Sequence, residues 1–144
     1  MSILHVIKRT GLLLLLGTTL SIVSGCAAFS NGQQAQLQGE VYYLERMALP
    51  ENAQVTVFLQ DISRADAPAP ILAQQVINTN GKQVPIPFTL SYDPTVIEGR
   101  HTYSIRAHIK VDDRLWFTTT EHIGLKLDGS DQQPIKLKLE RVMR

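Results

Sequence analysis

Short runs in which apolar and polar residues alternate recur along most of the chain. The clearest run covers residues 102–111 (TYSIRAHIKV), where the odd-numbered residues are apolar and the even-numbered ones are polar. Side chains of a β-strand point alternately to the two faces of its sheet, so this period of two predicts a strand with one face buried. The buried face should carry Tyr103, Ile105, Ala107, Ile109 and Val111.

Similar runs predict further strands at residues 39–44, 54–62, 71–78, 84–92, 114–121, 123–127 and 134–142. The run 84–92 carries Pro85 and Pro87, which have no backbone N–H to donate, so we expect it at a sheet edge or in an irregular stretch. The run 114–121 follows a tight turn at 111–114 and should pair back on 102–111 as a hairpin.

Segments rich in Pro, Asn, Asp and Gly separate these runs, as is typical of turns. No segment shows a convincing helical period of apolar residues. Short strands at this spacing indicate an antiparallel sandwich or barrel. We expect an all-β fold, an antiparallel β-sandwich of seven to eight strands and immunoglobulin/transthyretin-like type.

The N-terminal residues have a different character. Lys8 and Arg9 precede an uncharged, mostly apolar stretch at residues 11–23. As a helix this stretch would reach only about 20 Å, whereas the hydrocarbon core of a bilayer is about 30 Å thick. A charged start, a short apolar stretch and a small-residue end are typical of a secretory signal, so we expect a signal peptide over residues 1–25.

Cys26 is the only cysteine of the chain and directly follows that segment. Residues 23–26 (VSGC) resemble a bacterial lipobox, which implies a diacylglycerol on the Cys26 sulfur, cleavage before Cys26, and acylation (palmitate) of its new amino group. Several acyl chains give stable membrane attachment. The alternative is an ordinary signal peptide with an incidental cysteine. In similar lipoproteins, Asp directly after the lipidated cysteine favours retention in the inner membrane. This chain has Ala27 at that position. By the same resemblance, we expect the protein to be anchored in the outer membrane and to face the periplasm.

The mature chain divides into two parts. Residues 26–37 are small and polar and predict a flexible tether, and residues 38–144 predict one sandwich domain. The whole chain has 14 basic and 13 acidic residues, and without Lys8 and Arg9 the basic count is 12, for a net charge of −1. This balance disfavours nucleic acid as a partner.

Residues 39–94, together with the hairpin 105–119, resemble the YbaY-like lipoproteins, a family grouped with the YscW-type lipoprotein chaperones, or pilotins, of type III secretion. The resemblance implies a small β-sandwich at the outer membrane, and for secretion-linked members a chaperone that helps a secretin ring assemble. It transfers no site residue. The positions that carry it are Leu49, Pro50, Ala53, Val55, Val57, Leu59, Asp61, Ser63, Ala65, Asp66, Ala67, Pro68, Gly81, Lys82, Gln83, Pro85, Phe88, Leu90, Tyr92 and Pro94.

Residues suited to catalysis are few. His108 is one of the even-numbered, polar residues of the run 102–111, so we expect its side chain in solvent. His101 and His122 have no carboxylate or histidine at metal-ligand spacing. Asp112 and Asp113 fill a turn. We therefore expect no enzyme activity, no catalytic residue, no metal site and no cofactor; a hydrolase with an unrecognised site is a weaker alternative.

Three aromatic residues, Tyr42, Phe58 and Trp116, have the parity opposite to the apolar series of their runs, or nearly so. They are the candidate binding surface, because exposed aromatic side chains suit a peptide or a glycan. Alternatively, they lie under a loop, cover a sheet edge or form a second core layer. The expected partners are the membrane, through Cys26, and an envelope or secretin-type protein; the alternative is a glycan such as peptidoglycan.

Overall fold

The computed structural model describes residues 32–142. The predicted signal peptide, Cys26 and the first part of the predicted tether lie outside the described residues. The elements of the described part are β1 (Ala35–Tyr42), β2 (Gln54–Asp61), β3 (Ile71–Asn78), β4 (Ile86–Tyr92), the 3₁₀ helix η1 (Pro94–Val96), β5 (Tyr103–Val111), β6 (Arg114–Thr118), β7 (Ile123–Leu125), β8 (Ile135–Lys138) and β9 (Glu140–Arg141).

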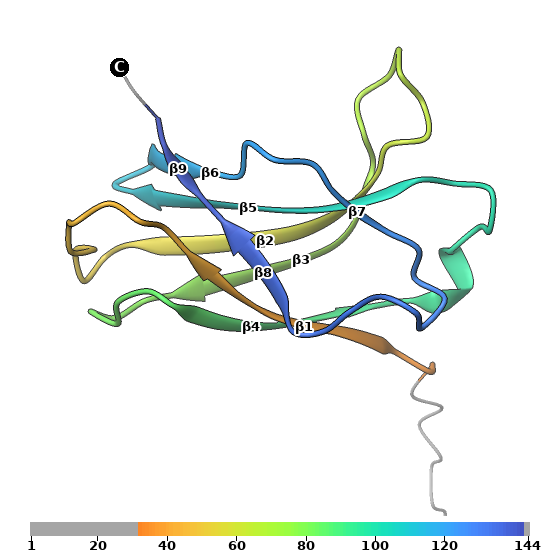
Figure 1. Cartoon of the computed structure of the whole chain (residues 1–144), viewed down its shortest axis with the longest axis horizontal. Coiled ribbons are helices and arrows are strands. Elements are labelled where there is room, and N and C mark those ends of the chain that lie inside the picture. The colour runs from red at the N-terminus through yellow and green to blue at the C-terminus, as the bar shows by residue number, and fades with distance from the viewer. Residues whose placement is uncertain (1–31, 143–144) are drawn as a thin grey trace, which may run out of the picture. The chain divides into compact units, whose positions relative to one another are not determined.

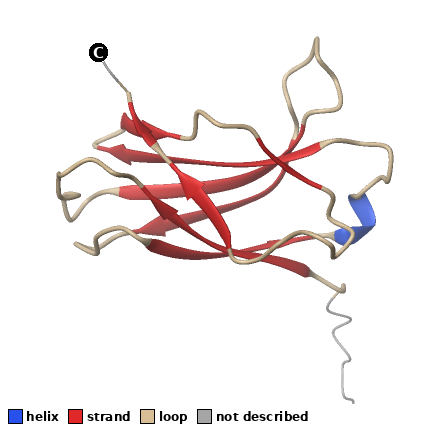
Figure 2. Cartoon of the chain, in the orientation of Figure 1, coloured by secondary structure: helices blue, strands red, loops and turns tan. Residues whose placement is uncertain are grey.

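The strands form two sheets that pack face to face (Figures 1 and 2). Sheet A has three strands in the order β4-β1-β8. Sheet B has six strands, in the order β3-β2-β5-β6-β9, and β7 pairs with the first part of β5. The predicted all-β sandwich is confirmed.

The core lies between the sheets and consists of the apolar side chains that occupy every second position of each strand. On β5 the five predicted inward residues are all buried, and Val55, Val57 and Leu59 of β2 are completely so. Burial of such side chains contributes about 1.5–3 kcal/mol each. Alternation along the sequence therefore located the core correctly.

The C-terminal run 134–142, predicted as one strand, is two strands in different sheets. β8 pairs with β1 in parallel, a departure from the all-antiparallel expectation. The chain then crosses at Leu139, whose N–H donates to Tyr42 O (2.8 Å), and Val142 N–H donates to Trp116 O (2.9 Å) in sheet B. This crossing raises the number of strands in residues 32–142 to nine.

The start of the fold also differs from expectation. β1 begins at Ala35, inside the segment 26–37 that was predicted as tether, and Leu37 is already buried between the sheets. The parity of Leu37 matches Val41, so the buried face of β1 continues toward the N-terminus beyond Gly39.

The proline-bearing strand β4 lies at one edge of sheet A, as predicted. Pro85 and Pro87 have no N–H to offer to a further strand. Thr89, of the same parity, donates its N–H to Gln75 Oε1 of β3 (3.1 Å). The open edge of β4 is thus poor in free donors, which protects it from pairing with another strand.

The predicted tight turn between β5 and β6 is confirmed. Asp112 and Asp113 have φ values of 49° and 60°. Two successive residues with positive φ are typical of the type I′ turn, whose twist matches that of a two-stranded hairpin, and aspartate tolerates this conformation.

Candidate functional site

The sandwich has two ends, and they differ in chemistry. We call the end where β1 begins the Ala35 end; β4 finishes and β5 starts there (Figure 1). The other end, the distal end, holds the last residue of β1, the β5–β6 turn and the last described residues of the chain (Figure 1). Eight strand residues separate the ends along β1, which is about 25 Å.

The distal end carries an open groove of about 950 Å³, which we call the Trp116 groove. Its lining residues are Leu44, Glu45, Arg114, Leu115, Trp116, Lys138, Leu139, Glu140, Arg141 and Val142. Half of these are apolar, and half are charged. Concave surfaces with an apolar floor and a few polar groups are the usual form of a binding site.

The apolar rim of this groove is held in place by the core. The Tyr43 ring stacks on Phe117 with centroids 4.2 Å apart, and the Tyr43 hydroxyl donates to Met47 O (2.8 Å). Because successive side chains of an extended segment face opposite ways, a buried Tyr43 turns Leu44 outward. Leu44 is 71% exposed, the highest value among the exposed large apolar residues of the described chain.

The charges of the groove are only partly balanced. Lys138 Nζ lies 3.6 Å from Glu140 Oε1, and both belong to the groove. Arg114 and Arg141 are exposed and form no ion pair with any residue in 32–142. Glu45 is exposed as well and forms no ion pair in this range, so the lining has three basic and two acidic residues. The two guanidinium groups beside an apolar floor suit a partner segment with apolar side chains and a carboxylate.

The three predicted aromatic residues do not come together. Trp116 is half-buried against the core and lines the groove. Tyr42 lies on sheet A, in a separate hollow of about 410 Å³ with Glu40, Pro85 and Lys136 among its lining residues. Phe58 points outward from sheet B and lines neither hollow. The alternation of apolar and polar residues predicted Trp116 as a surface residue of the site, but it did not predict the residues that surround Trp116 in the groove.

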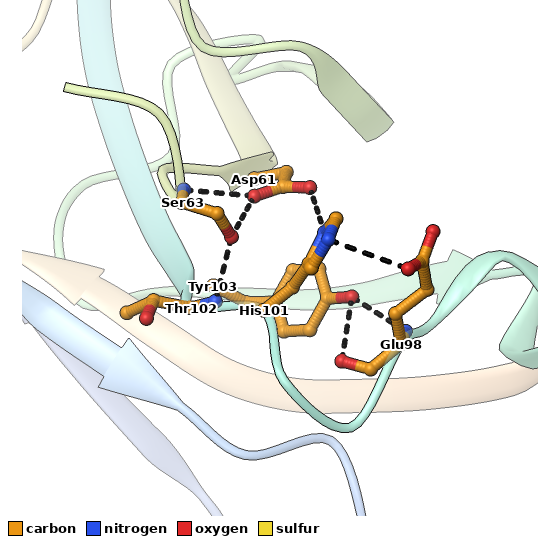
Figure 3. A network of polar contacts seen from close by, with 6 residues as sticks. All are labelled: Asp61, Ser63, Glu98, His101, Thr102 and Tyr103. Atoms are coloured by element: carbon orange, nitrogen blue, oxygen red, sulfur yellow. Dashed lines mark hydrogen bonds and ion pairs between the residues drawn. The ribbon is translucent and has the colours of Figure 1, made fainter.

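A polar network at the Ala35 end joins two loops (Figure 3). His101 Nδ1 lies 2.7 Å from Asp61 Oδ2, and His101 Nε2 lies 3.3 Å from Glu98 Oε2. Asp61 Oδ1 accepts hydrogen bonds from the N–H and the hydroxyl of Ser63. His101 thus has two carboxylate neighbours, and the expectation of none was wrong. Asp61 is 40 residues away in sequence and leaves no local signal, whereas Glu98 lies three residues before His101 and was within reach of local spacing.

This network resembles a catalytic triad only in composition. The Ser63 hydroxyl donates to Asp61 rather than to His101, so no base is placed to activate the serine. The same hydroxyl oxygen accepts the Thr102 N–H (2.9 Å), which is a structural contact between the two loops. Within residues 32–142, no group of three or more His, Cys, Asp or Glu side chains is arranged to hold a metal ion.

The Asp61–Ser63 pair belongs to a repeated motif that the sequence analysis overlooked. Asp-x-Ser/Thr occurs where β2 ends, after β4 and after β7, as DIS, DPT and DGS. In each case the carboxylate accepts the N–H and the hydroxyl of the residue two positions later. These hydrogen bonds lower the pKa of Asp61, Asp93 and Asp128, because they favour the ionised carboxylate.

These lowered pKa values predict that acid weakens the Ala35 end. A carboxyl whose pKa is lower in the folded state than its ordinary 3.8 contributes stability above pH 3.8, and this is lost as pH falls through the folded value. We expect Asp61→Asn to lose part of the stability at pH 7 and to show a smaller further loss between pH 5 and pH 3 than the wild type. Urea unfolding at these pH values measures both effects.

The control is Asp66→Asn in the exposed loop between β2 and β3, which should leave the pH profile unchanged. A wild-type profile that Asp61→Asn does not flatten would contradict the role assigned to this carboxylate.

The other two histidines of residues 32–142 lie apart from the network. His122 is exposed. His108, expected in solvent, is half-buried beside the Phe58 ring (centroids 5.6 Å apart), and burial together with Lys110 and Arg106 lowers the pKa of His108. Residues 32–142 contain no helix that is long and apolar enough to cross a bilayer.

The chain is similar to known proteins in sequence and in fold. YbaY, an uncharacterised lipoprotein of Escherichia coli (strain K12), is 41% identical over 87 residues, which make up 60% of this chain and 46% of that relative. The chain thus matches less than half the length of this curated relative. An alternative pilotin from the type II secretion system of Vibrio cholerae has a solved structure that is 45% identical, with a TM-score of 0.72, covering 77% of this chain and 99% of that chain.

The family described as type III secretion system lipoprotein chaperone (YscW) matches residues 32–139, which is almost the whole described part of the chain. The sequence resemblance to YbaY-like lipoproteins and pilotins is thereby confirmed. The chain belongs to the YscW family of lipoprotein chaperones.

Proposed function

We propose that this protein is a non-enzymatic outer-membrane lipoprotein that acts as a pilotin-like chaperone and binds a segment of a secretin-type subunit in the Trp116 groove. The observation that carries this proposal is the position of the groove at the end of the sandwich opposite to the start of β1. Family membership supports the chaperone role, and the solved pilotin supports it with the same fold.

The proposed membrane anchor fits this position. If Cys26 carries the lipid, residues 27–34 connect it to β1 and reach at most about 30 Å when fully extended. The anchor then joins the sandwich at its Ala35 end, and β1 carries the distal end about 25 Å further. A groove at the distal end thus lies away from the point of attachment, which suits the binding of another protein.

The partner segment should combine apolar side chains with at least one carboxylate. Leu44, Leu115 and Trp116 supply an apolar surface that is partly exposed in the free protein. Binding would remove this surface from water, which stabilises a complex by about 25 cal/mol per Å² before the entropic cost of association. Arg114 and Arg141 would pair with the carboxylate.

Site-specific photo-cross-linking in intact cells tests this function. A photoreactive amino acid at position 44 should form a cross-linked product that contains a secretin-type subunit, because Leu44 is on the rim of the groove. The same amino acid at position 96, an exposed apolar position at the Ala35 end, should not. Cross-links of equal yield from both positions, or none to an envelope protein from position 44, would refute the groove as the binding site.

The anchor gives a prediction of its own. Cys26→Ser removes the sulfur that would receive the diacylglycerol, so we expect the protein to leave the membrane fraction, either released into the periplasm or retained as the uncleaved precursor. Sucrose-gradient fractionation with mass spectrometry of the mature N-terminus measures this. Ala28→Ser is the matched control and should stay in the outer-membrane fraction; normal fractionation of Cys26→Ser would exclude lipid anchoring at this residue.

A further inference from the structure

The outer face of sheet B has an unusual charge pattern. Arg106, His108 and Lys110 point outward from β5 at every second position, since the residues between them face the core. None of the three forms an ion pair with a residue in the described range 32–142. Arg106 also donates a hydrogen bond to Thr119 O (3.3 Å), a neutral partner that leaves its charge unbalanced. Arg106 and Lys110 are like charges on one strand and repel each other, so their lack of a carboxylate partner has an electrostatic cost.

The strands on either side of β5 place no carboxylate opposite these three residues. Glu140 of β9 lies one strand beyond β6, opposite Thr118, and its carboxylate is paired with Lys138. The register places Gln54, Thr56 and Phe58 of β2 opposite the three basic residues of β5. Three residues of β3 lie opposite these in turn. The result is an array of nine side chains on the outer face, three from each strand. Read across the strands β3, β2 and β5, they are Asn78, Gln54 and Lys110, then Val76, Thr56 and His108, then Gln74, Phe58 and Arg106. The central residue, Thr56, is covered by its neighbours and is only 7% exposed. Apart from β5, the array is uncharged.

The outer face of sheet A is different, because its basic residues have carboxylate partners. Lys136 Nζ of β8 lies 3.7 Å from Glu40 Oε1 of β1. Lys138 Nζ of β8 lies 3.6 Å from Glu140 Oε1, a residue of β9 and therefore of sheet B. The two faces of the same sandwich therefore differ in that only the outer face of sheet B keeps a row of unpaired basic groups. The net charge of the chain, near zero, conceals this asymmetry.

We propose that the outer face of sheet B binds an anionic glycan of the cell envelope, with carboxylate-bearing peptidoglycan as the ligand. Arg106 and Lys110 pair with the carboxylates of the ligand. Amide groups of Gln54, Gln74 and Asn78 both donate and accept hydrogen bonds, which matches sugar hydroxyl groups.

Phe58 provides the apolar surface of the array. Its ring is half-buried beside His108, with centroids 5.6 Å apart, and the exposed part offers a flat surface for the C–H face of a sugar ring. The array extends about 10 Å across three strands and about 13 Å along β5, enough for a short oligosaccharide.

Other ligand classes fit the array less well. The centre of a protein interface is apolar and depleted of charge, whereas a row of basic side chains runs along this face. A membrane-binding face combines basic residues with several protruding apolar ones, and Val76, 48% exposed, is the single exposed large apolar residue of the array.

Co-sedimentation of the purified full chain with isolated peptidoglycan sacculi tests the proposal. The wild type should sediment with sacculi, and binding should weaken with rising salt because exposed charges are screened. Arg106→Gln combined with Lys110→Gln should lower the affinity at least about tenfold. The matched control, Arg100→Gln with Lys136→Gln, removes one arginine and one lysine from exposed positions outside the array and should stay within about twofold of wild type.

A second readout follows His108 by NMR. A carboxylate placed next to the imidazole favours the charged ring, so soluble peptidoglycan fragments should raise the pKa of His108 in the wild type and leave it unchanged in the double variant. This measurement distinguishes a direct contact from a loss of folding, and thermal unfolding of each variant checks the fold.

Three outcomes would overturn the proposal: no sedimentation of the wild type with sacculi, an equal loss in both double variants, or binding to phosphatidylglycerol vesicles in place of sacculi. The last would identify the face as membrane-binding. The array lies outside the Trp116 groove, so Leu44→Asp should bind sacculi normally, and the failure of one proposal leaves the other standing.

Discussion

Replacing Gly39 by alanine should strongly destabilise the sandwich. A Cβ at this position would meet the backbone oxygen of Ile135 and the ring of Phe88, both far inside normal contact distance. Gly39 pairs with Phe88 on one side and with Ile135 on the other, so neither neighbour can withdraw without breaking a strand pairing of sheet A. Overpacking of this severity costs about 3 kcal/mol or more.

The measurement is thermal unfolding of the purified chain. A loss of about 3 kcal/mol corresponds to a fall in Tm of roughly 12–20 °C for a domain of this size. Gly99→Ala is the control, because a Cβ there meets no atom within 4 Å, and it should change stability by less than about 0.5 kcal/mol. Equal Tm values for the two variants would mean that β8 does not pack against β1 as described.

Gly39 also illustrates what local sequence patterns reveal and what they do not. Alternation identified the strands, because burial of one face imposes a period of two on each strand separately. It could not show that Gly39 lies between Phe88 and Ile135, since these contacts join segments about 50 and 100 residues apart. The need for glycine arises from tertiary packing alone.

The crossing at Leu139 escaped prediction for a related reason. Ile135, Leu137 and Leu139 keep one unbroken alternation, and all three are buried in a core that both sheets share. A strand that leaves sheet A and joins sheet B keeps the same inward parity, so the pattern contains no sign of the change. The crossing became visible only through the partners of the backbone, Tyr42 and Trp116.

The candidate site was harder to predict than the fold. The Trp116 groove draws its lining from three separate segments, at 44–45, 114–116 and 138–142. In sequence, Leu44 merely extends the apolar run of β1, and only the burial of Tyr43 explains why Leu44 points into water. Parity singled out Trp116, Tyr42 and Phe58 as one set, whereas the two sheets separate them into three different environments.

Leu44→Asp should abolish most binding to the proposed secretin-type partner while leaving the fold intact. The side chain is 71% exposed in the free protein, so its replacement should change the free energy of unfolding by less than about 0.5 kcal/mol. In the complex, an apolar anchor at a groove rim contributes about 1–3 kcal/mol, and burying an aspartate there adds a desolvation cost. We expect the dissociation constant to rise about 10- to 100-fold.

The measurement is the affinity of the purified full chain for the subunit segment that cross-links to position 44, by calorimetry or fluorescence anisotropy. Val96→Asp is the matched control: it places the same charge on an exposed apolar residue, 48% exposed, at the Ala35 end. Trp116→Ala is less informative, because the indole also packs against the core and its loss would reduce stability.

Arg114→Glu should weaken binding as well. It replaces an unpaired guanidinium by a carboxylate, which would repel the carboxylate of the partner. Wild-type affinity in both Leu44→Asp and Arg114→Glu would exclude the Trp116 groove as the place where the partner binds.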